Sequence, residues 1–131
     1  MEQHIEKIKN YVLELGYELV HVDESEGVFV IKDEESGINN LAIGIADPLI
    51  IFEQFMFEIK NESLDVFRGL LQKNRDIIHG AFALDNTGTK VIFRDTLQLE
   101  NLDLNEFEGT INSLSLLLSE YSQTLINYSR V

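Results

Sequence analysis

Apolar residues recur at spacings of three and four over three stretches of the chain, and each stretch predicts an amphipathic helix. The first covers residues 2–15 and is followed by Gly16, a residue that adopts the left-handed cap conformation easily. The second runs to about Asn74 and begins after Asn61 or Ser63, either of which can cap a helix. The two stripes consist of Ile5, Ile8, Tyr11, Val12 and Leu15, and of Leu64, Phe67, Leu70 and Leu71.

The third stretch is the longest, and its apolar residues follow the alternating four-three spacing of a heptad repeat. Asp103 with Glu106, or Asn105 with Glu108, can form a capping box at its start. We expect this stripe to pack on the sheet of its own domain, and a coiled-coil partner is the alternative. Its members are Phe107, Ile111, Leu114, Leu118, Tyr121, Leu125 and Tyr128.

Between the helices, β-branched and aromatic residues alternate with polar ones, and Gly-containing turns separate the runs, a pattern that predicts strands. The resulting order is α-β-β-β-β-α-β-β-α. It predicts an α+β fold with an antiparallel sheet and N-terminal, middle and C-terminal helices, in a single domain of residues 1–131. The expected strands are residues 17–22, 28–32, 41–46, 49–60, 79–85 and 90–99.

The expected strand at residues 49–60 is largely apolar on both faces. Such a strand is covered on both sides, either by the protein's own helices or by a partner, and both options remain open at this point. Strict alternation assigns Ile50, Phe52 and Met56 to one face, which we take as a candidate partner surface. The opposite face receives Leu49, Ile51, Phe55, Phe57 and Ile59.

The composition is that of a globular protein, with 44% hydrophobic and 25% charged residues among 131. Cysteine is absent, which excludes disulfides, thiol nucleophiles and thiolate metal sites. The net charge of −13 makes nucleic acid and anionic membranes poor partners. Residues 1–4 show no targeting signal and no apolar stretch is long enough to cross a bilayer, so we expect a cytoplasmic protein.

The charge is unevenly distributed along the chain. Residues 60–94 contain six basic and four acidic residues, a net charge of +2, which leaves −15 for the remainder. A solvated acidic face that maintains solubility is the simpler explanation. The alternative is that the near-neutral middle region pairs with a partner, because like-charged subunits would associate through their least charged surface.

No motif for catalysis or for metal binding appears. His4, His21 and His79 lie in separate predicted elements, and there is no Gly-x-Ser-x-Gly elbow or Gly-rich phosphate loop. The acidic turns at residues 23–26 and 33–35 lack the residue order of a calcium loop. We therefore expect no catalytic residue, no cofactor and no metal, and an enzyme that uses His21 or His79 with carboxylates is the weakest hypothesis.

Four segments between Leu64 and Leu125 carry a distinctive set of apolar positions. They are residues 70–74 (LLQKN), 80–85 (GAFALD), 91–94 (VIFR) with Leu97, and 102–104 (LDL). These segments and the order of elements resemble the type III secretion chaperone-like fold, which is found in class I secretion chaperones and in the YbjN-like family. The small size and the acidic balance agree with that resemblance.

The resemblance implies a non-enzymatic homodimer in which a client segment winds over apolar patches. It also implies that the second helix contributes to pairing, which adds Leu64, Phe67 and Leu71 to the candidate partner or dimer surface. YbjN-like relatives share the fold, and some are described as regulators. The additional strand expected before Leu41 is a departure from the pattern of the family.

The leading hypothesis is a protein-binding module, chaperone-like or regulatory, that acts as a homodimer on a protein client. It would offer apolar sheet and helix surface, to which a client adds hydrophobic anchors or a strand at a sheet edge. The alternative is an acidic decoy or immunity-type protein that blocks a basic site. Strong salt dependence of binding would favour that alternative, since salt screens surface charge.

Overall fold

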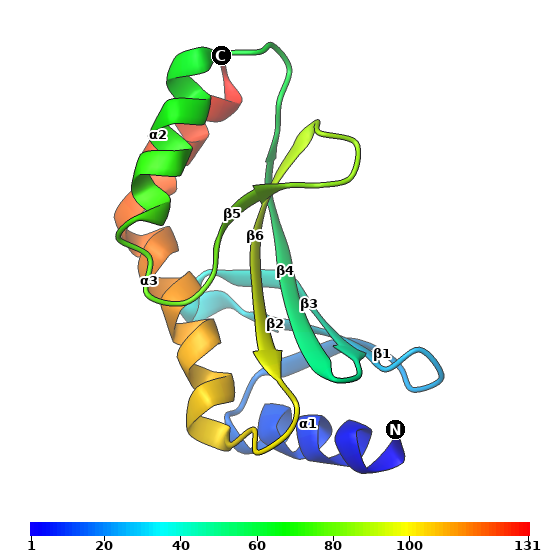
Figure 1. The fold of residues 1–131 in the computed structure, drawn as a ribbon. Helices are drawn as coiled ribbons and strands as arrows, with labels where there is room; N and C mark the ends of the chain where they lie inside the picture. Colours follow the sequence, from blue (N-terminus) through cyan, green and yellow to red (C-terminus); the bar gives the residue numbers. More distant parts are fainter.

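The computed structural model describes residues 1–131 and contains one six-stranded antiparallel sheet with three α-helices (Figure 1). The order of elements along the chain is the predicted one, which confirms the α+β fold class. Across the sheet the strand order is β1-β2-β3-β4-β6-β5. The elements are α1 (Glu2–Glu14), β1 (Glu18–Asp23), β2 (Val28–Asp33), the short 3₁₀ turn η1 (Glu34–Ser36), β3 (Ile38–Ala46), β4 (Leu49–Glu58), α2 (Leu64–Asn74), β5 (Ala81–Leu84), β6 (Lys90–Gln98) and α3 (Leu104–Ser129).

The helix boundaries follow from local capping chemistry. The Ser63 hydroxyl accepts a hydrogen bond of 3.3 Å from the backbone N–H three residues later, so Ser63 rather than Asn61 caps α2. Asp103 accepts the equivalent bond at 2.8 Å, so this residue rather than Asn105 caps α3. Gly16 follows α1 with φ +78°, the left-handed conformation that was expected of it.

The core lies between the helices and one face of the strongly twisted sheet (Figure 1). Phe29, Phe52, Phe93 and Phe107 are completely buried there. The rings of Phe52 on β4 and Phe107 on α3 lie 5.5 Å apart in a tilted arrangement. The apolar stripe of α3 therefore packs on the protein's own sheet, as expected, and no coiled-coil partner is needed to cover it.

The structure corrects the expected face assignment along β4. Ile50 and Phe52 point into the core, because the helices cover that side of the strand. The register with β6 shifts between Phe55 and Phe57, so that Met56 occupies a β-bulge and the alternation is reversed beyond it. Phe57 consequently shares the core side with Phe52, although strict alternation placed it with Phe55.

Contacts between α2 and the C-terminal half of α3, which lie side by side in Figure 1, orient α2. The Tyr128 hydroxyl packs against the backbone of Gly69. A side chain at position 69 would overlap this hydroxyl, so the close contact requires glycine there. Lys73 donates a hydrogen bond of 3.1 Å to that hydroxyl, and its ammonium group lies 5.2 Å from the Tyr128 ring centroid. This arrangement turns Leu64 and Leu71 away from the core.

Candidate protein-binding surfaces

The first candidate surface lies on α2 and β5 and is apolar although it faces solvent. Leu64 and Leu71 are 70% and 71% exposed, one heptad apart on the outer side of α2. Half-buried Phe67 lies between them in sequence, and Leu84 of β5 is 48% exposed. We call these four residues the α2–β5 surface. A groove of about 200 Å³ adjoins it, lined by Phe67, Leu70, Leu71, Asn74, Phe82, Ala83, Leu84 and Val91.

The backbone edge of β5 beside this surface is already occupied. Phe82 donates its backbone N–H to the Asn74 side-chain oxygen at 2.7 Å and accepts from the Asn74 amide nitrogen at 3.1 Å. Asn74 is the last residue of α2, so one side chain joins the helix end to the edge strand. Binding at the α2–β5 surface would therefore use apolar side chains rather than strand pairing at Phe82.

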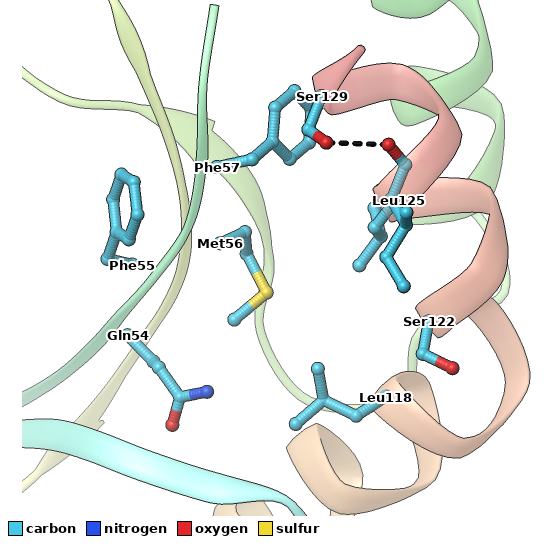
Figure 2. A pocket seen from close by; sticks show the side chains of 9 residues that line it. Gln54, Phe55, Met56, Phe57, Leu118, Ser122, Leu125 and Ser129 are labelled. Atoms are coloured by element: carbon cyan, nitrogen blue, oxygen red, sulfur yellow. Dashed lines mark hydrogen bonds between the residues drawn. The ribbon is translucent and has the colours of Figure 1, made fainter.

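The second candidate surface is a groove of about 240 Å³ between β4 and the C-terminal half of α3 (Figure 2). In Figure 2, Met56, Gln54, Leu118 and Leu125 point toward this space, whereas Phe55 lies on the other side of the β4 ribbon. We call it the β4–α3 groove. Its lining residues are Gln54, Phe55, Met56, Phe57, Leu118, Ser122, Leu125, Ile126 and Ser129.

The groove exists because β3 and β4 separate. Their last register pair toward this end is Ala42 with Glu53, and the chain of β3 bends at Asn40, which has φ +54°. Beyond that pair, the backbone N–H of Asn39 donates to the Gln54 side-chain oxygen at 3.0 Å instead of to a strand. The far end of β4 therefore has a strand neighbour only in β6.

The six candidate residues from the sequence are distributed over three places. Leu64, Phe67 and Leu71 come together on the outer side of α2. The proposal that Ile50 and Phe52 offer partner surface is wrong for the single chain, since both are completely buried against the helices. Met56 is half-buried and lines the β4–α3 groove, far along β4 from Ile50.

Two exposed apolar residues in these surfaces were not identified from the sequence. The pattern predicts that Leu84 lies in a strand, but its exposure follows from the position of β5 at the edge of the sheet, which the sequence does not specify. Ile126 is 44% exposed and lies outside the heptad stripe of α3. The sequence does carry a signal for Ile126, because an apolar residue outside the buried stripe of an amphipathic helix is expected to face solvent.

The histidines do not assemble a chemical site. His21 is exposed on β1, and His79 is exposed in the loop between α2 and β5, where its backbone N–H donates to the Ser113 hydroxyl at 3.2 Å. No three histidine or carboxylate side chains converge in a way that would hold a metal ion. None of the helices combines the length and the apolar character that crossing a membrane requires.

Comparison with solved structures shows that this fold recurs in secretion chaperones and in YbjN. YbjN from E. coli superposes with a TM-score of 0.67 at 12% identity, over 92% of each chain. The ExsC–ExsE complex gives a TM-score of 0.67 at 18% identity, with 95% of this chain and 94% of that chain covered. The Yersinia pestis type III secretion chaperone SycH, solved with a fragment of YscM2, gives 0.61 at 15% identity, with coverages of 96% and 99%.

A sequence search of curated proteins found no significant match. The family model CesT_Tir_1, in contrast, matches residues 1–131, which is the full length of the chain. The match agrees with the resemblance that was found in the segments around α2, β5, β6 and the start of α3. This chain belongs to the CesT_Tir_1 family.

Proposed function

We propose that this protein is a non-catalytic chaperone-like module that forms a homodimer through the α2–β5 surface and binds a protein client. The observation that carries the proposal is the solvent exposure of Leu64 and Leu71 on a helix whose opposite side is buried. Contiguous exposed apolar residues of this kind mark protein contacts in otherwise well-packed domains. Family membership supports the chaperone-like role.

Charge supports the choice of this surface for pairing. The segment that includes α2, β5 and most of β6 is the near-neutral part of a chain whose net charge is −13. Two copies that meet there avoid most of the repulsion between their acidic remainders. Two similar structures, the ExsC–ExsE complex and SycH with a fragment of YscM2, are complexes with a second protein, which supports a protein client here.

The solution mass tests the homodimer. Light scattering over a dilution series should give about twice 15.0 kDa for the parent protein and 15.0 kDa for Leu71→Glu, since a carboxylate cannot be buried unpaired in an apolar interface. Leu13→Glu is the matched control, because Leu13 is 63% exposed on α1, outside the α2–β5 surface. A parent that stays monomeric at every concentration, or a dimer that Leu71→Glu leaves intact, would overturn this part of the proposal.

A further inference from the structure

The fold leaves the sulfur of Met56 accessible inside the β4–α3 groove. Met56 lies at the β-bulge between the register pairs of Phe55 and Phe57, and its side chain is half-buried. β3 pairs with β4 only as far as Glu53, so no neighbouring strand covers this part of β4 on the β3 side. Figure 2 shows the thioether pointing into the groove, whose volume of about 240 Å³ exceeds that of a water molecule. A small oxidant can therefore reach the sulfur from solvent.

Sulfur chemistry in this chain is confined to two methionines. The sequence contains no cysteine, so no thiol is present to consume an oxidant or to form a disulfide. Met1, the other methionine, is 57% exposed at the start of α1. Hydroperoxides convert accessible thioethers into sulfoxides, which changes a flexible apolar side chain into a polar one. Met56 is therefore the residue through which oxidation acts on the β4–α3 groove.

A largely buried polar side chain faces the same groove with an unused donor. Gln54 is 5% exposed and lies two residues before Met56 on β4. Its side-chain oxygen accepts from the Asn39 N–H at 3.0 Å, whereas its amide nitrogen bonds to no group of the protein. In Figure 2 the Gln54 amide and the Met56 thioether both point into the groove. Since a primary amide carries two N–H donors, the groove holds a hydrogen-bond donor without an acceptor in the protein.

The oxidised form of Met56 would supply the missing acceptor. A thioether sulfur accepts hydrogen bonds only weakly, whereas the oxygen of a sulfoxide is polar and accepts them well. Such an oxygen is costly in an apolar groove unless a donor meets it. The α3 wall offers mainly Leu118, Leu125 and Ile126, which cannot donate, and the groove contains no charged side chain. Gln54 is the donor that lies on the same strand as the sulfur.

We propose that Met56 is a site of reversible oxidation to methionine sulfoxide and that the Gln54 amide donates a hydrogen bond to the new oxygen. A hydroperoxide is the oxidant: its O–O bond breaks, a sulfur lone pair forms the S–O bond, and a proton moves to the leaving oxygen, which departs as water or an alcohol. The sulfur is oxidised and the peroxide is reduced. The product makes one wall of a largely apolar groove polar, so the β4–α3 groove is a redox-sensitive surface. This inference goes beyond the proposed function and does not depend on the homodimer.

The first test treats the folded full-length protein with hydrogen peroxide and locates the added oxygen by mass spectrometry of its peptides. We expect one oxygen on Met56 and one on Met1, with a circular dichroism spectrum that stays that of the folded protein. Met56→Leu, which nearly preserves the apolar volume, is the matched control and should gain oxygen on Met1 only. Met1 also serves as an internal reference, because it is largely exposed. A Met56 that stays unmodified when Met1 is completely converted would overturn the inference.

The second test follows the side-chain amide of Gln54 by NMR. Its amide protons should shift when the parent protein is oxidised, and should not move when Met56→Leu is treated in the same way. Gln98, which is exposed on β6, provides a second amide for comparison and should not respond. Treatment with a methionine sulfoxide reductase should return the Gln54 signals to their original positions. Unchanged Gln54 signals in a protein that carries the Met56 sulfoxide would refute the hydrogen bond.

Urea denaturation separates a hydrogen bond from simple proximity. Oxidation should lower the folding equilibrium constant roughly fivefold more in Gln54→Leu than in the parent, the factor expected for one neutral hydrogen bond. Each protein is compared with its own reduced form, so the lost bond to Asn39 cancels. Peroxide-treated Met56→Leu measures the contribution of Met1, which is subtracted. Equal effects of oxidation in the parent and in Gln54→Leu would overturn the role of Gln54, and circular dichroism confirms beforehand that each variant is folded.

Discussion

The side-chain carbonyl of Gln54 accepts a hydrogen bond of 3.0 Å from the backbone N–H of Asn39. Gln54 is only 5% exposed and lies on the side of β4 that is otherwise apolar. The bond joins β3 to β4 just beyond their last register pair, so it substitutes for a strand hydrogen bond where the two strands separate. The same side chain lines the β4–α3 groove.

Replacement of Gln54 by Met should lower the free energy of unfolding by about 1–2 kcal/mol, because the Asn39 N–H loses its partner in a partly buried position. Urea denaturation at equilibrium measures the change. Gln123→Met is the control: Gln123 is exposed and bonds only to Asn127 on the same helix, so its loss should stay within about 0.5 kcal/mol. Equal losses of unfolding free energy for the two variants would show that the hydrogen bond between Gln54 and Asn39 stabilises the protein no more than the exposed bond of Gln123 does.

Two glycines in helices should respond oppositely to replacement by Ala. At Gly69 the added methyl group would overlap the Tyr128 hydroxyl and lie 3.0 Å from the ring carbon that carries it, so we expect a loss of about 1–3 kcal/mol. At Gly109 the nearest atom would be His79 Nε2 at 3.7 Å, an ordinary contact, and the helix preference of Ala should add about 0.5–1 kcal/mol. Thermal unfolding shows whether each variant is less or more stable than the parent. A Gly69→Ala protein that is more stable than the parent would contradict the close contact between α2 and α3.

Phe52→Ala should destabilise the protein by about 3–5 kcal/mol, because it removes a completely buried ring that packs on Phe107. Chemical denaturation followed by circular dichroism measures the loss. Leu13→Ala, at a position 63% exposed on α1, should change stability by less than about 0.5 kcal/mol. A stable Phe52→Ala protein with impaired association would instead restore Phe52 as part of a partner surface.

Burial raises the pKa of the Tyr17 phenol to about 12 from its ordinary value of 10.0, and the nearby carboxylates Glu108 and Asp33 add to the effect. The folded state therefore holds this proton more tightly than the unfolded state does. Its contribution to stability is complete below about pH 10 and is lost as the pH rises from about 10 to 12. Tyr17→Phe removes this contribution and should flatten the decline of stability over that range.

Alkaline absorbance titration of tyrosinate in the parent and in Tyr17→Phe measures this pKa directly. The difference between the two curves should rise at about pH 12, in line with the raised pKa of Tyr17. A difference curve that rises near pH 10 would show that Tyr17 is solvated in the folded protein.

Several local features followed from nearby residues alone. The capping side chains Ser63 and Asp103 act on N–H groups three residues away, and the left-handed Gly16 ends α1 through its own backbone. The heptad spacing of α3 places Phe107 and Leu114 on one face regardless of what covers them. Such features depend on short sequence separations, which is why the order of elements could be predicted. In the sequence pattern Leu64 and Leu71 belong to the apolar stripe of the second helix, and only the family resemblance points to them as a partner surface.

The placement of Ile50 and Phe52 could not be predicted in the same way. Alternation shows that the two share a face of β4, but not whether the helices cover that face or the opposite one. The bulge at Met56 then reverses the alternation and moves Phe57 to the core side, and nothing in the residues themselves announces it.

By itself, the sequence determined the elements, two alternative caps for each of α2 and α3, the stripe of α3 and the acidic balance, because periodicity and charge are properties of neighbouring residues. Only the tertiary structure decided which face of β4 is buried, where β3 leaves β4 and which apolar residues remain in solvent. The distance between Asn39 and Gln54 depends on how the whole sheet twists and how the helices pack on it. Burial is a property of the assembled layers, so no single segment specifies it.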